Sequence, residues 1–295
     1  MRLAVGRDAD FVPDEGVALL RQAMDAGDGE ATSIMATLTG AGAWTQQSWP
    51  QALDLLQLAA ERGCADAGRQ LELLAPQAKG SPKALRDAIV LEQWITPAPS
   101  RQVSETPRVY AIEGFADDAI CDWLIARAQG RLANALIFDG HAKAQSGRRS
   151  NSSFGIDIVG SGVVTLLLRF RIMGATGLSV THMEPPNILH YGIGEEYVPH
   201  HDCLYAAANQ AARVNGDRRA TFLLYLNDGY QGGELDFPRA GLSHKGRRGD
   251  AVFFANMIDG EPDPLALHAG LPVTDGEKWL FSQWIWDRPF AGRMT

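Results

Sequence analysis

The chain has 295 residues, enough for one large domain or two modest ones, and its composition of 45% hydrophobic and 21% charged residues is ordinary for a globular protein. The formal net charge of −8 disfavours nucleic acid and anionic membranes as main partners, because those bind basic surfaces. Three cysteines without CxxC spacing, no leader-like N-terminus and no apolar run of membrane-spanning length exclude a disulfide framework and a membrane span, so we expect a cytoplasmic protein.

Residues 14–75 predict short helices with an internal repeat. Apolar and small residues recur after 36 positions, as Leu19, Leu20, Ala23, Gly27 and Ala31, then Leu55, Leu56, Ala59, Gly63 and Ala67. Small residues at fixed places let helices pack closely, which is typical of helix–turn–helix repeats. The stretch resembles two tetratricopeptide-like repeats of the Sel type, which implies a peptide-binding surface or an oligomer interface; an unrelated helical bundle is the alternative.

Two stretches rich in proline, serine and charge, 76–83 and 97–107, predict linkers. A short helix from Ala84 to Trp94 is expected between them. We place a boundary near residue 100, which divides the chain into a helical repeat domain at 1–98 and a second domain at 99–295.

The second domain has a mixed pattern. PRVYAIEGF (107–115) predicts a strand, DDAICDWLIARAQ (117–129) a helix with Asp117 or Asp118 as N-cap, and the apolar segment 162–178 a longer helix. From Asn187 to Trp286, short β-type runs alternate with glycine and aspartate turns. The expected class is α+β: a double-stranded β-helix (jelly roll) buttressed by helices and preceded by an all-α repeat domain.

The stretch YVPHHDCLY (197–205) places three potential metal ligands side by side. In an extended backbone, His200 and Asp202 project from one face and His201 from the other. The His-x-Asp pair therefore delivers an imidazole and a carboxylate to one point, with His201 as the less favoured ligand. Cys203 is predicted to be a core thiol.

A third ligand is expected from another strand, and the downstream histidines are His244 and His268. His268 is flanked by apolar residues that fit a buried strand, whereas His244 lies in a glycine-rich, basic turn, so we favour His268. Two imidazoles and one carboxylate leave coordination positions open, which suits non-haem Fe(II) with a cosubstrate and O₂.

Ten residues after His268, Lys278 interrupts an apolar strand. An ammonium group in a barrel interior needs an anion, because burying an unpaired charge is costly. A dicarboxylate that chelates iron at one end would offer its far carboxylate to Lys278, and Tyr191 could donate its phenol to the same group. A lysine that merely extends its tip to solvent, and a tyrosine that only fills the core, are the alternatives.

Five stretches in this order and spacing resemble the prolyl 4-hydroxylase family of Fe(II)/2-oxoglutarate dioxygenases: HYGIGEEYVPHHD, RRATFLLYLND, GGELDFP, GDAVFFANM and LHAGLPVTDGEKWLFSQWI. The resemblance covers about residues 107–290. It implies iron ligands at His200, Asp202 and His268. It also implies that the C5 carboxylate of 2-oxoglutarate is bound by Lys278, Tyr191 and Thr221.

On the substrate side, the resemblance implies that Arg218 contacts substrate. Family members often have a histidine eight residues after the lysine, where this chain has Trp286, which puts prolyl recognition in doubt. Trp286 or Trp284 is predicted either to line the substrate mouth or to fill the core. Arg148 and Arg149 are predicted to lie in a mobile lid or in a solvated loop.

We expect a dioxygenase that uses Fe(II), 2-oxoglutarate, O₂ and, as a further candidate, ascorbate to hydroxylate an aliphatic carbon of a peptide or protein. A prolyl residue is the leading target. Because Asp202 occupies the position that a halide would need, hydroxylation is favoured over halogenation. The alternatives are a hydroxylase of a free amino acid or small metabolite, and a non-catalytic scaffold that binds partners through its repeats.

Overall fold

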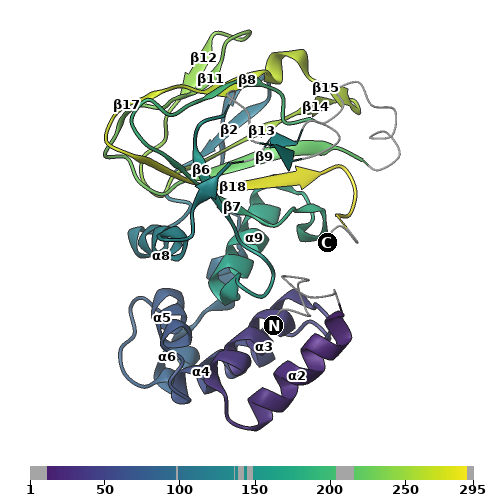
Figure 1. Cartoon of the computed structure of the whole chain (residues 1–295), viewed down its shortest axis with the longest axis vertical. Coiled ribbons are helices and arrows are strands. Elements are labelled where there is room, and N and C mark those ends of the chain that lie inside the picture. The colour runs from purple at the N-terminus through teal and green to yellow at the C-terminus, as the bar shows by residue number, and fades with distance from the viewer. Residues whose placement is uncertain are drawn as a thin grey trace. The chain divides into compact units, whose positions relative to one another are not determined.

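The structure, a computed structural model, describes residues 12–97, 99–135, 137–138, 143–144, 149–203 and 216–290 (Figure 1). The chain forms two compact units. In the described part, the helical unit comprises residues 12–97 and 156–174, and the sheet unit comprises residues 99–155 and 175–290. The division is therefore discontinuous, whereas the sequence predicts a single boundary near residue 100.

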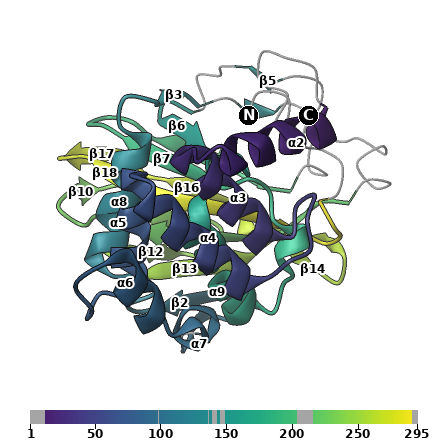
Figure 2. The same ribbon diagram turned by 90° about the horizontal axis from the view of Figure 1, so that it is seen from below.

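From residue 12 onward, the described part of the helical unit opens with two helical hairpins, formed by α2 (Pro13–Asp25), α3 (Gly29–Ala41), α4 (Trp49–Glu61) and α5 (Ala65–Leu74). α2 and α4 begin at residues 13 and 49, and α3 and α5 at residues 29 and 65, so both pairs are offset by 36 residues. Gly27 and Gly63 turn the chain within the hairpins with φ of 95° and 85°, values that favour glycine. Figure 2 shows α3 and α4 side by side.

The region after α5 contains two short helices, α6 (Pro82–Ala88) and α7 (Leu91–Ile95), where the sequence predicts one. The β-branched pair Ile89 and Val90 is extended, with ψ of 120° and 97°, and this breaks the helix. The indole of Trp94 donates a hydrogen bond to the Leu74 carbonyl, which ties α7 back to the end of α5.

Helix α9 (Gly162–Thr176) confirms the predicted long apolar helix, and residues 162–174 of it belong to the helical unit. The Phe170 ring packs edge-on against Trp49, with 5.0 Å between ring centroids. The Val164 amide donates to the Gln70 side chain at 3.3 Å. α9 is apolar around most of its circumference, so it is buried by this packing.

The sheet unit contains two main antiparallel sheets and, in the described residues, three two-stranded ones. The larger has the order β1-β2-β13-β9-β18-β7-β6-β3 and the smaller β12-β11-β16-β8. The larger sheet is formed by β1 (Arg101–Ser104), β2 (Val109–Ile112), β3 (Ala133–Asn134), β6 (Ser152–Gly155), β7 (Asn187–Tyr191), β9 (Arg218–Tyr225), β13 (Ala251–Ala255) and β18 (Lys278–Trp286). The smaller is formed by β8 (Tyr197–His200), β11 (Leu235–Phe237), β12 (Leu242–His244) and β16 (His268–Gly270).

The two sheets face each other across one core, as Figure 1 shows for β8, β11 and β12 over β9, β13 and β18. Leu235 and Phe237 of the smaller sheet pack with Leu223, Val252 and Phe254 of the larger. This mixed architecture agrees with the predicted α+β class and is consistent with a jelly roll.

Short elements complete the described part of the sheet unit: β4 (Ile137–Phe138), β5 (Lys143–Ala144), β10 (Gln231–Gly232), β14 (Met257–Ile258), β15 (Glu261–Pro262), β17 (Val273–Asp275), η1 (Val180–His182) and η3 (Pro264–Ala266). Helix α8 (Asp118–Ala128) is capped by Asp117, whose carboxylate accepts a hydrogen bond from the Ile120 amide. The predicted linker 97–107 contains β1, which pairs with β2 at the edge of the larger sheet. Across the described residues, no helix combines the length and apolarity that crossing a bilayer would require.

Candidate metal and cosubstrate site

The three predicted metal ligands lie together at one edge of the smaller sheet. His200 ends β8, Asp202 follows two residues later, and His268 opens β16, where it pairs directly with His200. The Asp202 carboxylate lies 3.5 Å from His200 Nε2 and 3.6 Å from His268 Nε2. The ligand atoms lie within 4.8 Å of one another, and no other such group of three occurs in the part of the chain that the structure describes.

Both imidazoles are oriented by backbone carbonyls. Nδ1 of His200 lies 2.9 Å from the Val198 oxygen, and Nδ1 of His268 lies 3.0 Å from the Ala266 oxygen. A carbonyl can only accept, so each Nδ1 donates and each Nε2 presents its lone pair to the shared point. Burial, reinforced by neighbouring His200, lowers the pKa of His268 to about 4, so at neutral pH this imidazole is ready to bind a metal.

The Asp202 carboxylate is positioned by a buried threonine. Thr221 Oγ1 donates to Asp202 Oδ2 at 2.5 Å and accepts from Asn256 Nδ2 at 2.9 Å. Burial alone would raise the pKa of Asp202, but the two imidazoles and the Arg218 guanidinium hold it well below its usual range. Thr221 donates its proton to Asp202 and so orients a metal ligand, while its predicted contact with 2-oxoglutarate stays a prediction.

The alternative histidines lie elsewhere. His244 is in β12, paired with Leu235, and its ring centroid is 6.1 Å from that of Tyr225. His201 is outside the ligand group, and its Nδ1 is buried without a hydrogen-bond partner among the described residues. Cys203 is buried as predicted, and burial raises the pKa of its thiol.

Lys278 is 3% exposed and lies opposite Tyr191 in the β18–β7 ladder. Its ammonium donates to the Gly233 carbonyl at 2.5 Å and lies 5.1 Å from the centre of the Tyr191 ring. Burial lowers the pKa of Lys278 to about 7, and burial also raises the pKa of Tyr191. A buried cation whose close partner is a carbonyl fits a bound anion, because a carboxylate would stabilise its charge.

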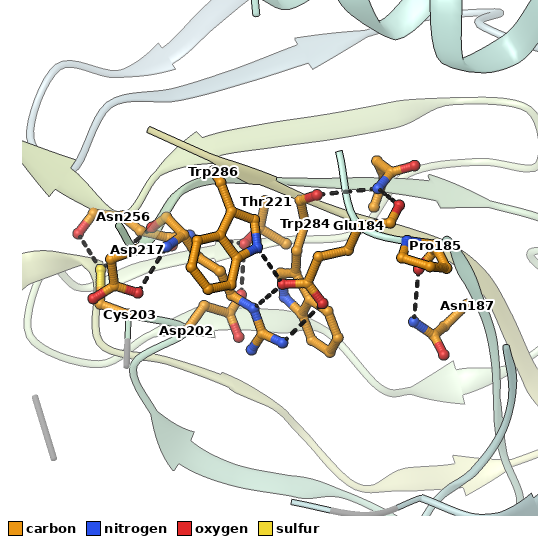
Figure 3. Close-up of polar contacts among 12 residues, drawn as sticks. Glu184, Pro185, Asn187, Asp202, Cys203, Asp217, Thr221, Asn256, Trp284 and Trp286 are labelled. Carbon is orange, nitrogen blue, oxygen red and sulfur yellow. Dashed lines mark hydrogen bonds and ion pairs between the residues drawn. The ribbon is translucent and has the colours of Figure 1, made fainter. Parts of the chain in front are cut away.

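Arg218 is held by Glu184, a residue without a predicted role, which Figure 3 shows beside Trp284 and Trp286. Its Nε and Nη2 donate to the two Glu184 oxygens at 2.6 and 3.1 Å. Its guanidinium lies 3.7 Å from the centre of the Trp284 ring. The indole of Trp286 donates to Glu184 Oε1 at 2.6 Å, and the Gln283 amide donates to the Glu184 backbone oxygen, also at 2.6 Å. We call Glu184, Arg218, Trp284 and Trp286 the arginine clamp.

Sequence reasoning had no signal for Glu184, because it lies in the irregular segment between η1 and β7 rather than in a patterned element. Glu184 reaches Arg218 because its segment is tied to β18, through a bridge between Met183 and Ile285, and β18 in turn pairs Trp286 with Arg218 of β9. Trp286 is 4% exposed, so it is packed in the clamp and its indole is already hydrogen-bonded.

Tyr197 and Arg149 form a stack on the metal ligand His200. The Tyr197 and His200 rings are nearly parallel, with centroids 3.4 Å apart, and the Arg149 guanidinium lies 4.8 Å from the centre of the Tyr197 ring. Ideal strand alternation would place Tyr197 and His200 on opposite faces, but the β8–β16 register shifts at this point. Arg149 is 7% exposed, which contradicts a solvated loop, and Arg148 lies outside the described residues.

Two imidazoles and one carboxylate with open positions, next to a buried ammonium group, define a metal- and oxoacid-dependent oxygenase. A family model described as the 2OG-Fe(II) oxygenase superfamily matches residues 186–286. The chain is 32% identical over 224 residues to probable prolyl 4-hydroxylase 6 of Arabidopsis thaliana, covering 67% of this chain and 75% of the relative. It is 33% identical over 219 residues to prolyl 4-hydroxylase 2 of the same plant, covering 65% and 71%.

A solved structure of the viral collagen prolyl hydroxylase from Paramecium bursaria Chlorella virus-1, in complex with 2OG, is also similar, at 26% identity and a TM-score of 0.44. The match covers 60% of this chain and 95% of the viral chain. On the strength of the plant relatives, the chain belongs to the prolyl 4-hydroxylase-like family of 2OG-Fe(II) oxygenases. It is a 2-oxoglutarate-dependent dioxygenase that uses Fe(II), 2-oxoglutarate and O₂.

The donor set fits these groups. When bound, Fe(II) with 2-oxoglutarate and O₂ supplies the oxidising power that hydroxylates a C–H bond, and the oxoacid leaves as succinate and CO₂. His200, Asp202 and His268 would hold the ion on one side, and Lys278 and Tyr191 would hold the far carboxylate. The buried walls exclude water, and Thr221 and the two backbone carbonyls keep the ligands in place before anything binds.

Proposed function

We propose that the substrate is a peptide or protein and that the carbon hydroxylated belongs to a prolyl residue. The arginine clamp is the observation that supports this best. Arg218 lies near enough to Asp202 for its charge to lower the pKa of that carboxyl, so the clamp borders the metal site. Nη1 of Arg218 makes no hydrogen bond to any residue that the structure describes, which leaves its two N–H bonds as donors for a substrate carbonyl.

The clamp also supplies aromatic surface. Trp284 is half-buried and its ring lies against the Arg218 guanidinium, so part of it can contact a substrate, and proline-containing segments pack well against aromatic walls. The similarity to plant prolyl 4-hydroxylases supports the same substrate class. Because Glu184 neutralises Arg218, the clamp favours an uncharged acceptor such as a peptide carbonyl over a free amino acid with its own charges.

The test compares short proline-containing peptides with free proline and other amino acids, measuring succinate release and a mass gain of one oxygen atom. We expect turnover of peptides and little turnover of free amino acids. Hydroxylation of a free amino acid alone would refute the proposal, and so would 2-oxoglutarate consumption that no peptide stimulates.

Arg218→Lys provides the matched variant, because lysine keeps the charge but loses the two-pronged contact with Glu184. We expect its KM for peptide to rise about tenfold while its affinity for 2-oxoglutarate is retained. Arg219→Lys is the control, because the neighbouring Arg219 is exposed. Equal KM values for the two variants would count against a role of the clamp in peptide binding.

We further propose that the N-terminal hairpins are Sel-type repeats that bind partner segments or a second copy of the chain. The 36-residue offset of their helices, and the positive φ at both Gly27 and Gly63, support this. Sedimentation of the whole protein distinguishes the two uses: a dimer favours self-association, and a monomer favours partner binding.

A further inference from the structure

The chain segment between β9 and β11 closes the end of the core beside Lys278. Its Asn227 is tied to the start of β18, because Nδ2 donates to the Glu277 oxygen at 2.7 Å and Oδ1 accepts from the Trp279 amide at 2.8 Å. Tyr230 of the same segment is 1% exposed and belongs to the core of the sheet unit, together with Tyr191. Tyr230 therefore lies where the strand that bears Lys278 begins.

The phenol ring of Tyr230 and the stem of Lys278 flank the same glycine. A Cβ added to Gly233 would lie 3.1 Å from Tyr230 Cε2 and 3.2 Å from Lys278 Cδ. Cε2 is bonded to the carbon that bears the hydroxyl, so the hydroxyl-bearing half of the Tyr230 ring and the Lys278 stem pack on the same glycine. The Gly233 carbonyl, in turn, accepts the hydrogen bond from the Lys278 ammonium.

A second lysine fixes the ring. Lys245 Nζ donates to the Tyr230 backbone oxygen at 2.7 Å and lies 4.0 Å from the centre of the Tyr230 ring. A cation over the face withdraws electron density from the ring, which makes the phenol a stronger hydrogen-bond donor. The position of the Tyr230 ring is therefore fixed by contacts that do not involve its hydroxyl.

That hydroxyl is buried and has no hydrogen-bond partner among the described residues. A buried polar group without a partner is uncommon and destabilising, so it needs a physical reason. The Lys278 ammonium, whose stem packs on the same glycine, donates to the Gly233 carbonyl. A buried phenol without an acceptor and a buried ammonium, both belonging to side chains that pack on Gly233, indicate a site for an anion.

We propose that Tyr230 is a binding residue for 2-oxoglutarate, whose hydroxyl donates to the far carboxylate that Lys278 pairs with. A carboxylate has two oxygens and about four acceptor positions, so it can accept from the ammonium and the phenol together. The proposal rests on the cosubstrate assignment and is independent of the peptide proposed above, because binding is measured without any prime substrate.

Tyr230→Phe in the full chain tests this by calorimetry and thermal unfolding with Mn²⁺ in place of iron. Without 2-oxoglutarate, the variant should unfold at the same or a higher temperature, because a buried hydroxyl with no partner has been removed. With 2-oxoglutarate, its Kd should rise about 10- to 100-fold, as expected for a lost hydrogen bond to a charged group. The stabilisation by 2-oxoglutarate should shrink accordingly.

Tyr225→Phe is the matched control, because the Tyr225 hydroxyl is also buried without a hydrogen-bond partner among the described residues, but its ring packs beside Gly246 and His244 rather than on Gly233. It should bind 2-oxoglutarate with the wild-type Kd. A second ligand, 2-oxopentanoate, has the same carbon chain with a methyl group in place of the far carboxylate, so Tyr230→Phe should not change its Kd.

A wild-type Kd of Tyr230→Phe for 2-oxoglutarate would overturn the proposal. An equal loss of affinity for 2-oxoglutarate and 2-oxopentanoate would also overturn it, because the hydroxyl would then not address the far carboxylate. A marked fall in the unfolding temperature of the ligand-free variant would show that the hydroxyl has a structural partner, and would overturn it as well.

Discussion

The Asp202 carboxylate is the last member of a chain of two buried hydrogen bonds, from Asn256 to Thr221 and from Thr221 to Asp202. The spacing of His200 and Asp202 predicts that this pair meets, because alternation along a strand is a local property, whereas His268 was predicted from its apolar flanks and from the family resemblance. The partner of Thr221 could not be predicted, because a hydroxyl in a core can donate to any acceptor within reach. For single residues, the sequence can predict which side chains lie close together, but not which hydrogen-bond partner each of them has.

Thr221→Val keeps the shape of the side chain but removes the donor to Asp202. We expect its Kd for Mn²⁺ or Co²⁺ to rise about 10- to 100-fold, the usual effect of losing a partner of a metal ligand. Titration calorimetry measures this. Thr165→Val is the control, because Thr165 is buried in α9 and its hydroxyl has no hydrogen-bond partner among the described residues. An unchanged metal affinity of Thr221→Val would contradict the assigned role.

The ammonium group of Lys278 makes cosubstrate binding dependent on pH. Burial lowers its pKa from 10.5 to about 7, so above pH 7 the ligand-free protein loses this proton, while a bound carboxylate favours the charged form. Binding then takes up a proton, and the affinity for 2-oxoglutarate should fall by up to about tenfold per pH unit above that value. Calorimetry in buffers of different ionisation enthalpy measures the proton uptake, which Lys278→Met should abolish.

Helix α8 shows what can be predicted at the scale of elements. Its sequence predicts a helix that starts at Asp117 or Asp118, and the structure selects Asp117, whose side chain caps the Ile120 amide. From Asn187 onward, strands such as β7, β9, β13 and β18 lie in the β-type runs that the sequence predicts between turns. β1 was not predicted, because it lies in a stretch of proline, serine and charge and, among the described strands, pairs only with β2.

Asp117→Ala should lower the free energy of unfolding by about 1 kcal/mol, because the Ile120 amide loses its cap. Asp118→Ala should lower the free energy of unfolding by less, since the Asp118 side chain is 80% exposed and its ion pair with Arg248 lies on the surface. Urea denaturation of both variants measures the difference. Equal losses would mean that the cap is not the stabilising feature.

At the scale of the whole molecule, α9 determines how the chain is divided. Its apolar pattern predicts a buried helix but not what buries it, because packing partners distant in sequence leave no trace in a local pattern. The observed partners, Gly40, Trp49 and Gln70, all precede residue 98. The predicted domain at 99–295 would therefore contain a helix whose packing surface belongs to the other unit.

Removal of residues 1–97 should leave the apolar face of α9 exposed, and the fragment should aggregate or bind a hydrophobic dye. Co-expression of residues 1–97 as a separate chain should restore soluble protein. Size-exclusion chromatography and dye fluorescence check both outcomes. A monomeric fragment with the unfolding temperature of the full chain would refute this role of α9.

The carbonyl groups of Val198 and Ala266 hold both imidazoles in their binding orientation before any ion arrives. Such a preoriented pair does not by itself favour iron, because later first-row ions such as cobalt, nickel and zinc bind nitrogen and oxygen donors more tightly than ferrous iron does. Occupancy of the site by iron therefore depends on the concentrations of the competing ions. In a cell with little iron or excess zinc, we expect the protein to stay folded but to lose its hydroxylase activity.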